Sequence, residues 1–225
     1  MVLKRRPFLN EKELRERWFA LWARTGARAH GVGVYAELMA HYAESHRAYH
    51  TIKHVSHCLY RFEQVIHLMK HPDEVAMALW FHDAVHDPEA KDNELKSAEL
   101  ATRLLNENYV SYRFARRVHD YILPTDHKKK PENPDAQLMV DIDACILGES
   151  ELIFDEYDRV EIPREYVELA KVPEEIFRKR RVEILTLFLK RPSIYCTEYF
   201  RSIYEAQAAR NLRRAIMKLK SPILG

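Results

Sequence analysis

The sequence predicts an all-α protein, and two observations support this fold class. The chain has only five glycines in 225 residues, and no run of strictly alternating apolar and polar residues is long enough for a strand. Apolar residues recur instead at the three- and four-residue spacing of amphipathic helices. We therefore expect a helical bundle along the whole chain.

Helix-start signals and apolar spacing predict three helices before residue 70. The first follows Asn10 as its N-cap and ends near Gly26. Its apolar face is formed by Leu14, Trp18, Leu21 and Trp22. A second helix is expected over about 34–45, and a third from about 51 to 69, where His71-Pro72-Asp73 ends it and opens the next.

The fourth predicted helix, over 75–85, is short and apolar on most of its faces. A helix that is apolar all round belongs in the interior of the protein. His82 and Asp83 stand at its carboxyl end. We therefore expect these two polar groups to lie in the core.

The rest of the chain predicts further helices and one irregular loop. A fifth helix should start at residues 92–94, and a sixth should cover 112–123. The loop is expected over 124–135, which contains three prolines and a run of lysines. An apolar helix over 136–148 should end at Gly148 as its C-terminal glycine, and the last helices should lie within 154–219.

Composition limits the classes of partner. Lys and Arg number 36 against 34 Asp and Glu, a formal charge of +2, which is too small to indicate a nucleic-acid polymer or an anionic membrane as partner. We find no secretory signal and no apolar run near the roughly 20 residues of a membrane span. The three cysteines, which have no CxxC spacing, suit a reducing compartment, so we expect a cytoplasmic protein.

Histidines are concentrated in one region of the chain. Nine of the twelve lie between His41 and His86. Acids and imidazoles inside apolar helices are costly to bury unless a common partner, such as a metal ion, satisfies them. The apolar helices supply His54, the pair His82-Asp83, and Asp141 or Asp143. This donor set favours one divalent transition metal, Mn, Fe, Co, Ni or Zn, over Mg or Ca.

The order His, His-Asp, Asp is that of the HD superfamily, and longer segments resemble it too. The chain is similar to a bacterial branch of predicted metal-dependent HD phosphohydrolases in the segments 47–55, 80–101, 122–127 and 141–148. The similarity continues into FDEYDRVEIPREY and YEAQAARNL, so it covers most of the chain. This branch usually has tyrosine before the Asp-Pro, where this chain has His86.

The resemblance implies a fold, a ligand set and an activity. The fold would be a single HD-type helical domain over 1–225, with its metal-site core at about 46–150 and C-terminal helices at 151–220. The ligands would be His54, His82, Asp83 and Asp143. Asp143 is preferred to Asp141 because the family's last acid directly precedes a small residue and an apolar run to the glycine. The expected activity is hydrolysis of a small phosphorylated substrate, such as a nucleotide, by metal-activated water.

Further side chains are candidates for catalysis and substrate binding. Beside Asp83, Asp87 or Glu94 would orient the water or protonate the leaving oxygen. The structural alternatives are a turn cap before Pro88 for Asp87, and a helix-dipole role for Glu94. The candidates for substrate binding are Arg47, His50, Lys53, Asn93 and His127, with the lysines at 128–130 as a possible lid.

Several alternatives stay open at this stage. His54 could be a hydrogen-bonded core residue and Asp143 a partner of an arginine. A second metal is conceivable if an early helix start aligns His46, His50 and His54, or if His119 and His127 take part. His57, His67 and His71 are expected at the surface. The competing functions are a di-iron HD oxygenase and a regulatory protein that keeps its metal only for stability. The sequence does not predict an oligomeric state.

Overall fold

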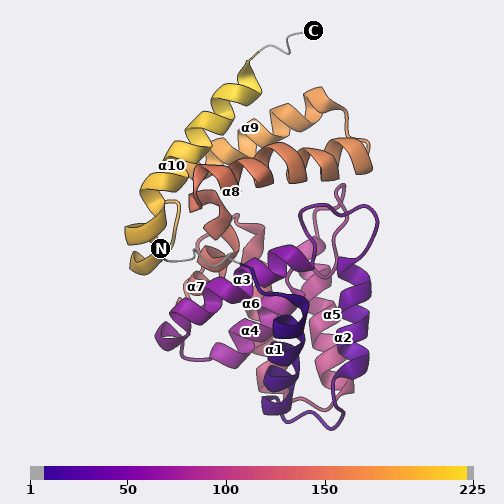
Figure 1. Cartoon of the computed structure of the whole chain (residues 1–225). Coiled ribbons are helices and arrows are strands. Elements are labelled where there is room, and N and C mark those ends of the chain that lie inside the picture. The colour runs from indigo at the N-terminus through magenta and orange to yellow at the C-terminus, as the bar shows by residue number, and fades with distance from the viewer. Residues whose placement is uncertain (1–7, 222–225) are drawn as a thin grey trace, which may run out of the picture. The chain divides into compact units, whose positions relative to one another are not determined.

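The computed structural model describes residues 8–221, and all regular structure in this range is helical (Figure 1). No strand occurs among these residues, which confirms the all-α prediction. The described chain divides into two compact units, residues 8–44 with 50–143 and residues 45–49 with 144–221. The expectation of a single domain stays a prediction.

The first unit contains seven of the α-helices and two short 3₁₀ turns. They are α1 (Glu11–Arg24), α2 (Val32–Tyr42), α3 (Ile52–Val65), η1 (Ile66–Leu68), α4 (Pro72–Phe81), α5 (Asn93–Glu107), α6 (Tyr112–Ile122), η2 (Leu123–Asp126) and α7 (Pro134–Asp143). The predicted helices are all present. The fourth begins and ends earlier than expected, because Pro72 occupies its first turn and His82 follows its last residue.

Helix α4 forms the centre of the first unit. It packs against α1, α3, α5, α6 and α7 (Figure 1), and every residue from Glu74 to Phe81 is buried. The Trp80 ring meets the Trp18 ring of α1 edge to face with centroids 5.3 Å apart, and the Tyr42 hydroxyl donates to the Trp80 carbonyl at 2.9 Å. The carboxyl end of α4 therefore opens into the interior, as its apolar sequence predicts.

Capping residues fix where the helices of the first unit start. Asn10 and Glu13 form a capping box at α1, with the Glu13 amide donating to Asn10 Oδ1 at 3.0 Å and the Asn10 amide donating to Glu13 Oε2 at 2.8 Å. Thr51 is the N-cap of α3, and its Oγ1 accepts from the Lys53 amide. His54 consequently lies in the first turn of α3.

Asp135 ties the start of α4 to the start of α7. Its carboxylate accepts the backbone amides of Lys70 at 2.9 Å and His71 at 2.8 Å, and the Tyr121 hydroxyl at 3.2 Å. The predicted bounds of the irregular loop, 124–135, are wrong at both ends. Residues 123–126 form η2, and Asp135 is a buried residue of α7, because this carboxylate satisfies amides that precede α4.

The second unit contains the remaining helices. They are η3 (Ala144–Gly148), α8 (Glu151–Glu156), η4 (Tyr157–Glu161), η5 (Arg164–Leu169), α9 (Glu174–Lys190) and α10 (Glu198–Lys220). The Asn211 side chain of α10 donates to the carbonyls of Leu147 and Glu149, both at 2.9 Å. The turns η4 and η5 are π-helical, a geometry that apolar spacing does not predict.

Gly148 has a different role from the one expected. Helix α7 ends at Asp143, and a 3₁₀ turn continues to Gly148, whose backbone is not in the left-handed region. A Cβ at this position would lie 2.6 Å from Tyr204 Cβ and 2.7 Å from the Tyr195 hydroxyl oxygen. The glycine is needed for close packing of η3 on α10 and not as a helix cap.

Within residues 8–221, no helix combines the length and the apolar character that crossing a lipid bilayer requires. This agrees with the absence of a predicted span. The cytoplasmic location stays a prediction.

Candidate metal centre

The four predicted ligands converge at one point inside the first unit. His54 Nε2 lies 3.0 Å from His82 Nε2 and 3.0 Å from Asp143 Oδ1. Asp83 Oδ2 lies 3.3 Å from His54 Nε2 and 3.1 Å from His82 Nε2. Helices α3 and α7 and the end of α4 thus bring together residues that are up to 89 positions apart in the chain.

These separations fit a shared divalent metal. With metal–ligand bonds of about 2.1 Å, neighbouring donor atoms lie roughly 3.0 Å apart around an octahedral ion and roughly 3.4 Å apart around a tetrahedral one. The donor separations here run from 3.0 to 3.5 Å. Both imidazoles are almost fully buried, whereas about a fifth of the Asp83 side chain is exposed, so the centre is reached from the side of the carboxylates.

Backbone and side-chain partners orient the donor atoms. His82 Nδ1 lies 3.0 Å from the Leu79 carbonyl oxygen. Because a carbonyl oxygen can only accept, Nδ1 is the nitrogen that carries the proton in this hydrogen bond. This tautomer leaves the lone pair of Nε2 free for a metal. On the opposite carboxylate oxygen, Asp143 Oδ2 lies 2.8 Å from His127 Nε2. His127 therefore holds the orientation of the Asp143 carboxylate.

The geometry distinguishes Asp143 from Asp141. Successive helix positions are about 100° apart, so side chains two positions apart point in nearly opposite directions. Asp143 is the acid whose oxygens lie beside His54, His82 and His127. Asp141 is a separate buried residue of α7. The acid beside the two histidines is therefore Asp143, the one that the resemblance implies.

Charge interactions shift the ionisation of the clustered groups. Burial opposes the charged form of His82, yet Asp83 and Asp143 raise its pKa well above the ordinary value. Burial likewise opposes ionisation of Asp83, but the charge and hydrogen bond of His82 hold its pKa below the usual range. The pKa of Asp143 is also lowered against the effect of burial, by hydrogen bonds with His127, His54 and His82. The carboxylates are therefore in the ionised form that binds a cation.

Cys58 is a neighbour of the cluster that the sequence interpretation passed over. It is fully buried one turn after His54 in α3. Its sulfur and one donor atom each of His54, His82 and Asp143 all lie within 4.8 Å of one another. The sulfur is 3.9 Å from His54 Nδ1 and 3.7 Å from Nε2. A sulfur that shared a metal with Nε2 would lie much nearer to Nε2 than to Nδ1. The two distances are nearly equal, so the thiol packs against the imidazole ring instead. The four-residue spacing from His54 was the available signal.

Glu94, Asp87 and Asn93 lie around the loop that follows the His82-Asp83 pair. Burial raises the pKa of Glu94, and the charges of Asp83 and Asp126 raise it further. Asp87 is exposed, and its carboxylate accepts the Glu89 amide at 2.9 Å. Asn93 accepts the Asp87 amide at 3.0 Å and donates to the Asp87 carbonyl at 2.8 Å. Asp87 and Asn93 thus shape the turn, while Glu94 is electrostatically coupled to the cluster.

The candidate substrate-binding residues occupy different places. The His50 ring stacks on the His86 ring with centroids 4.1 Å apart, and its neighbour is the His54 ring at 6.2 Å. Lys53 is exposed, and its ammonium lies over the Phe8 ring. Arg47 is a buried residue of the second unit. Of the two candidates in the first unit, His50 is the one whose ring lies next to the ring of His54.

The structure bears on one open alternative and one expectation about histidines. Helix α3 begins at Ile52, so His46 and His50 precede it and do not continue the helical face of His54. His57 was expected at the surface, but it is buried and its ring lies 5.4 Å from the Phe8 ring. His67 is exposed, as predicted.

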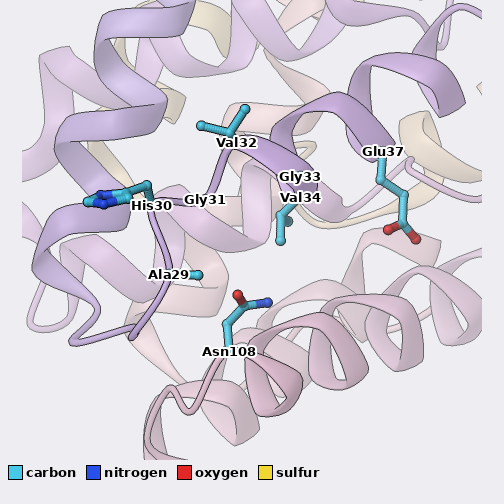
Figure 2. A pocket seen from close by; sticks show the side chains of 8 residues that line it. All are labelled: Ala29, His30, Gly31, Val32, Gly33, Val34, Glu37 and Asn108. Carbon is cyan, nitrogen blue, oxygen red and sulfur yellow. The ribbon is translucent and has the colours of Figure 1, made fainter.

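A separate hollow in the first unit contains none of the predicted site residues (Figure 2). It is lined by Ala29, His30, Gly31, Val32, Gly33, Val34, Glu37 and Asn108. Two of its polar side chains are engaged within the chain, since Glu37 pairs with Arg103 at 2.9 Å and the Asn108 side-chain amide donates to the Leu104 carbonyl. The cluster of His54, His82, Asp83 and Asp143 is therefore the better candidate for a functional site.

Comparisons with known proteins gave no match among family models, curated proteins or solved structures. The interpretation of the site accordingly depends on its residues and their geometry.

Proposed function

We propose that this protein is a metal-dependent phosphohydrolase of the HD superfamily that acts on a small phosphorylated molecule such as a nucleotide. One observation carries the proposal. Two imidazole nitrogens and two carboxylate oxygens converge with separations of 3.0–3.5 Å, and they occur in the chain order that names the superfamily. The donor set also suits Mn, Fe, Co, Ni or Zn.

A divalent ion held by His54, His82, Asp83 and Asp143 would supply an activated water and polarise a phosphoryl oxygen. The residues of the chain prepare the place for it. Leu79 fixes the tautomer of His82, and His127 holds Asp143. The buried imidazoles restrict access to the side where the Asp83 and Asp143 side chains are partly exposed.

Glu94 is the side chain best suited to proton transfer. Its raised pKa, caused first by burial and then by Asp83 and Asp126, means that it keeps a proton to higher pH than an ordinary glutamate. Such a group is better suited than an ordinary glutamate to protonate a leaving oxygen. Asp87 and Asn93 position the turn before Glu94, and His50 is the nearest candidate for contact with the substrate phosphate.

The test combines metal analysis with a screen for phosphate release. The purified protein is analysed for bound elements and assayed on nucleotides and simple phosphoesters with added Mn, Co, Ni, Zn or Fe. We expect one metal per chain and metal-dependent release. Asp83→Ala should lose both, whereas Asp92→Ala, which changes an exposed acid paired with Lys96, should keep both.

Full phosphate release by the Asp83→Ala variant, or a wild-type protein that binds no metal, would refute the proposal. Two irons per chain with visible absorption and no release would favour the oxygenase. Tightly bound metal without release of phosphate from any phosphoester would favour a purely structural role.

A further inference from the structure

Helix α9 of the second unit exposes large apolar side chains on the face next to its packed face. Its packed face is formed by Phe177, Arg181, Leu185 and Phe188, which are buried. On the neighbouring face, Ile176 is 45% exposed, Ile184 46% and Leu187 61%. Large apolar side chains that gather on one exposed helix face are typical of a surface that another protein covers.

The exposed face has the spacing of a helix-pairing seam. Ile176, Arg180, Glu183 and Leu187 follow one another at intervals of four, three and four residues, which keeps them in line along the helix. The ends of the seam are apolar and its centre carries one positive and one negative side chain. Arg180 and Glu183 are both exposed, and within residues 8–221 neither of them has an ion-pair partner.

This pattern is complementary to itself in one orientation. If two copies of α9 cross antiparallel with the two-fold axis between positions 181 and 182, Ile176 of each copy faces Leu187 of the other. In the same register, Arg180 of each copy faces Glu183 of the other. A parallel pair would instead place Arg180 against Arg180 and Glu183 against Glu183, and such like-charge contacts are unfavourable.

We propose that the exposed face of α9 is a homodimer interface in which a second copy of this chain packs antiparallel about a two-fold axis. The two ion pairs fix the register, and the apolar ends exclude water. The proposal is independent of the metal centre and of the proposed activity.

The expected association is moderate. Helix α9 has 17 residues and is about 26 Å long, so a single helix pair buries less than the ~1,600 Å² of a standard interface. We expect a dissociation constant on the order of micromolar, as for a weak and reversible complex. The dimer should therefore form and dissociate over an accessible range of protein concentration.

The test is sedimentation velocity of the full chain at increasing concentration, with four variants. Arg180→Glu and Glu183→Arg should each raise the dissociation constant at least about tenfold, because each replaces two ion pairs with two like-charge contacts. The double exchange Arg180→Glu with Glu183→Arg restores opposite charges in the same register and should restore dimerisation. Leu152→Lys, at a residue that is 83% exposed in α8, controls for loss of apolar surface elsewhere and should dimerise normally.

Circular dichroism confirms that each variant is folded. A wild-type chain that stays monomeric at all concentrations would overturn the proposal and leave the face to a different partner. A dimer that the single charge reversals do not weaken, or a folded double exchange that stays monomeric, would overturn the assignment of α9 and of its register.

Discussion

The side chains at the centre of the site are unfavourable neighbours unless a cation joins them. His54 Nε2 and His82 Nε2 are 3.0 Å apart, and the carboxylates of Asp83 and Asp143 meet them at similar distances. A proton on His82 satisfies part of this arrangement, as its raised pKa shows. A divalent ion satisfies all four donors at once, since each lone pair then points at one charge. This arrangement of donors is therefore one that can hold a metal ion.

At the residue scale, Glu94 gives a sharp prediction for the proposed reaction. Glu94→Gln keeps the size of the side chain and removes its ability to transfer a proton, so kcat should fall by about 10²- to 10⁴-fold. Metal content should be unchanged, because Glu94 is not among the clustered donors. Phosphate release and elemental analysis measure the two effects.

Glu99→Gln, which changes an exposed glutamate of the same helix, is the matched control and should have wild-type kcat. Near-normal turnover in Glu94→Gln would remove Glu94 from the proton-transfer role. Loss of metal in that variant would instead make it part of the metal site.

The sequence identifies a candidate site residue well when a polar side chain stands at a position that the apolar pattern predicts to be buried. His54 and Asp143 lie in helices with many buried apolar residues, and the His82-Asp83 pair directly follows another. A buried polar group there needs a partner, and the structure brings these four side chains together. Cys58 and His57 were not recognised, because a buried cysteine or histidine has no distinct local pattern. Gly148 has a role that depends on Tyr195 and Tyr204, which are remote in sequence. Local signals cannot report such contacts.

At the element scale, helix starts were predictable where a side chain caps the helix. Asn10 with Glu13 and Thr51 are local signals, and the structure uses both. The π-helical turns η4 and η5 were not predictable, because buried partners set their register. In the second unit, Arg181 of α9 donates to Asp158 of η4 at 2.9 Å, and Glu165 of η5 accepts the amides of Ala48 and Tyr49 at 2.8 and 2.9 Å.

Asp135 gives the prediction at the element scale, because it joins the two helices that carry His82 and Asp143. Asp135→Ala would leave two backbone amides and the Tyr121 hydroxyl without their acceptor. We expect the free energy of unfolding to fall by about 2–4 kcal/mol. Urea denaturation followed by circular dichroism measures this change.

Asp135→Asn keeps one acceptor oxygen and should have a smaller effect. Asp120→Ala, at an exposed acid of α6, should change stability by only about 0.5 kcal/mol or less. An Asp135→Ala variant as stable as the Asp120→Ala control would show that the link between α4 and α7 is unimportant for stability.

At the scale of the whole molecule, net charge and composition say little about function. A formal charge of +2 excludes few small ligands, and the ionisable groups that matter are concentrated in one place. The stability of the protein should therefore depend on pH and on metal through the same few groups. This coupling can be measured without knowing the substrate.

Without metal, the pKa shifts of the cluster determine the sign of the pH dependence. The raised pKa of His82 means that its stabilising effect is complete below the unfolded value of about 6.5 and is lost as the pH rises through the folded pKa. The lowered pKa values of Asp83 and Asp143 mean that their effect is present above about 4 and is lost as the pH falls. The metal-free protein should therefore be most stable between about pH 4 and 6.5.

Metal binding should reverse the loss of stability at higher pH. A metal would replace the proton on His82 Nε2, so the affinity for the metal increases as the pH rises. A ligand that binds only the folded state stabilises that state by an amount that grows with the logarithm of its affinity. The difference in Tm between metal-loaded and chelator-treated protein should consequently grow from pH 5 to pH 8. Differential scanning calorimetry across this range measures it, and Asp83→Ala should show little difference at any pH. A difference that stays constant or shrinks as the pH rises would mean that metal and proton do not compete at His82, and that the ion binds elsewhere in the chain.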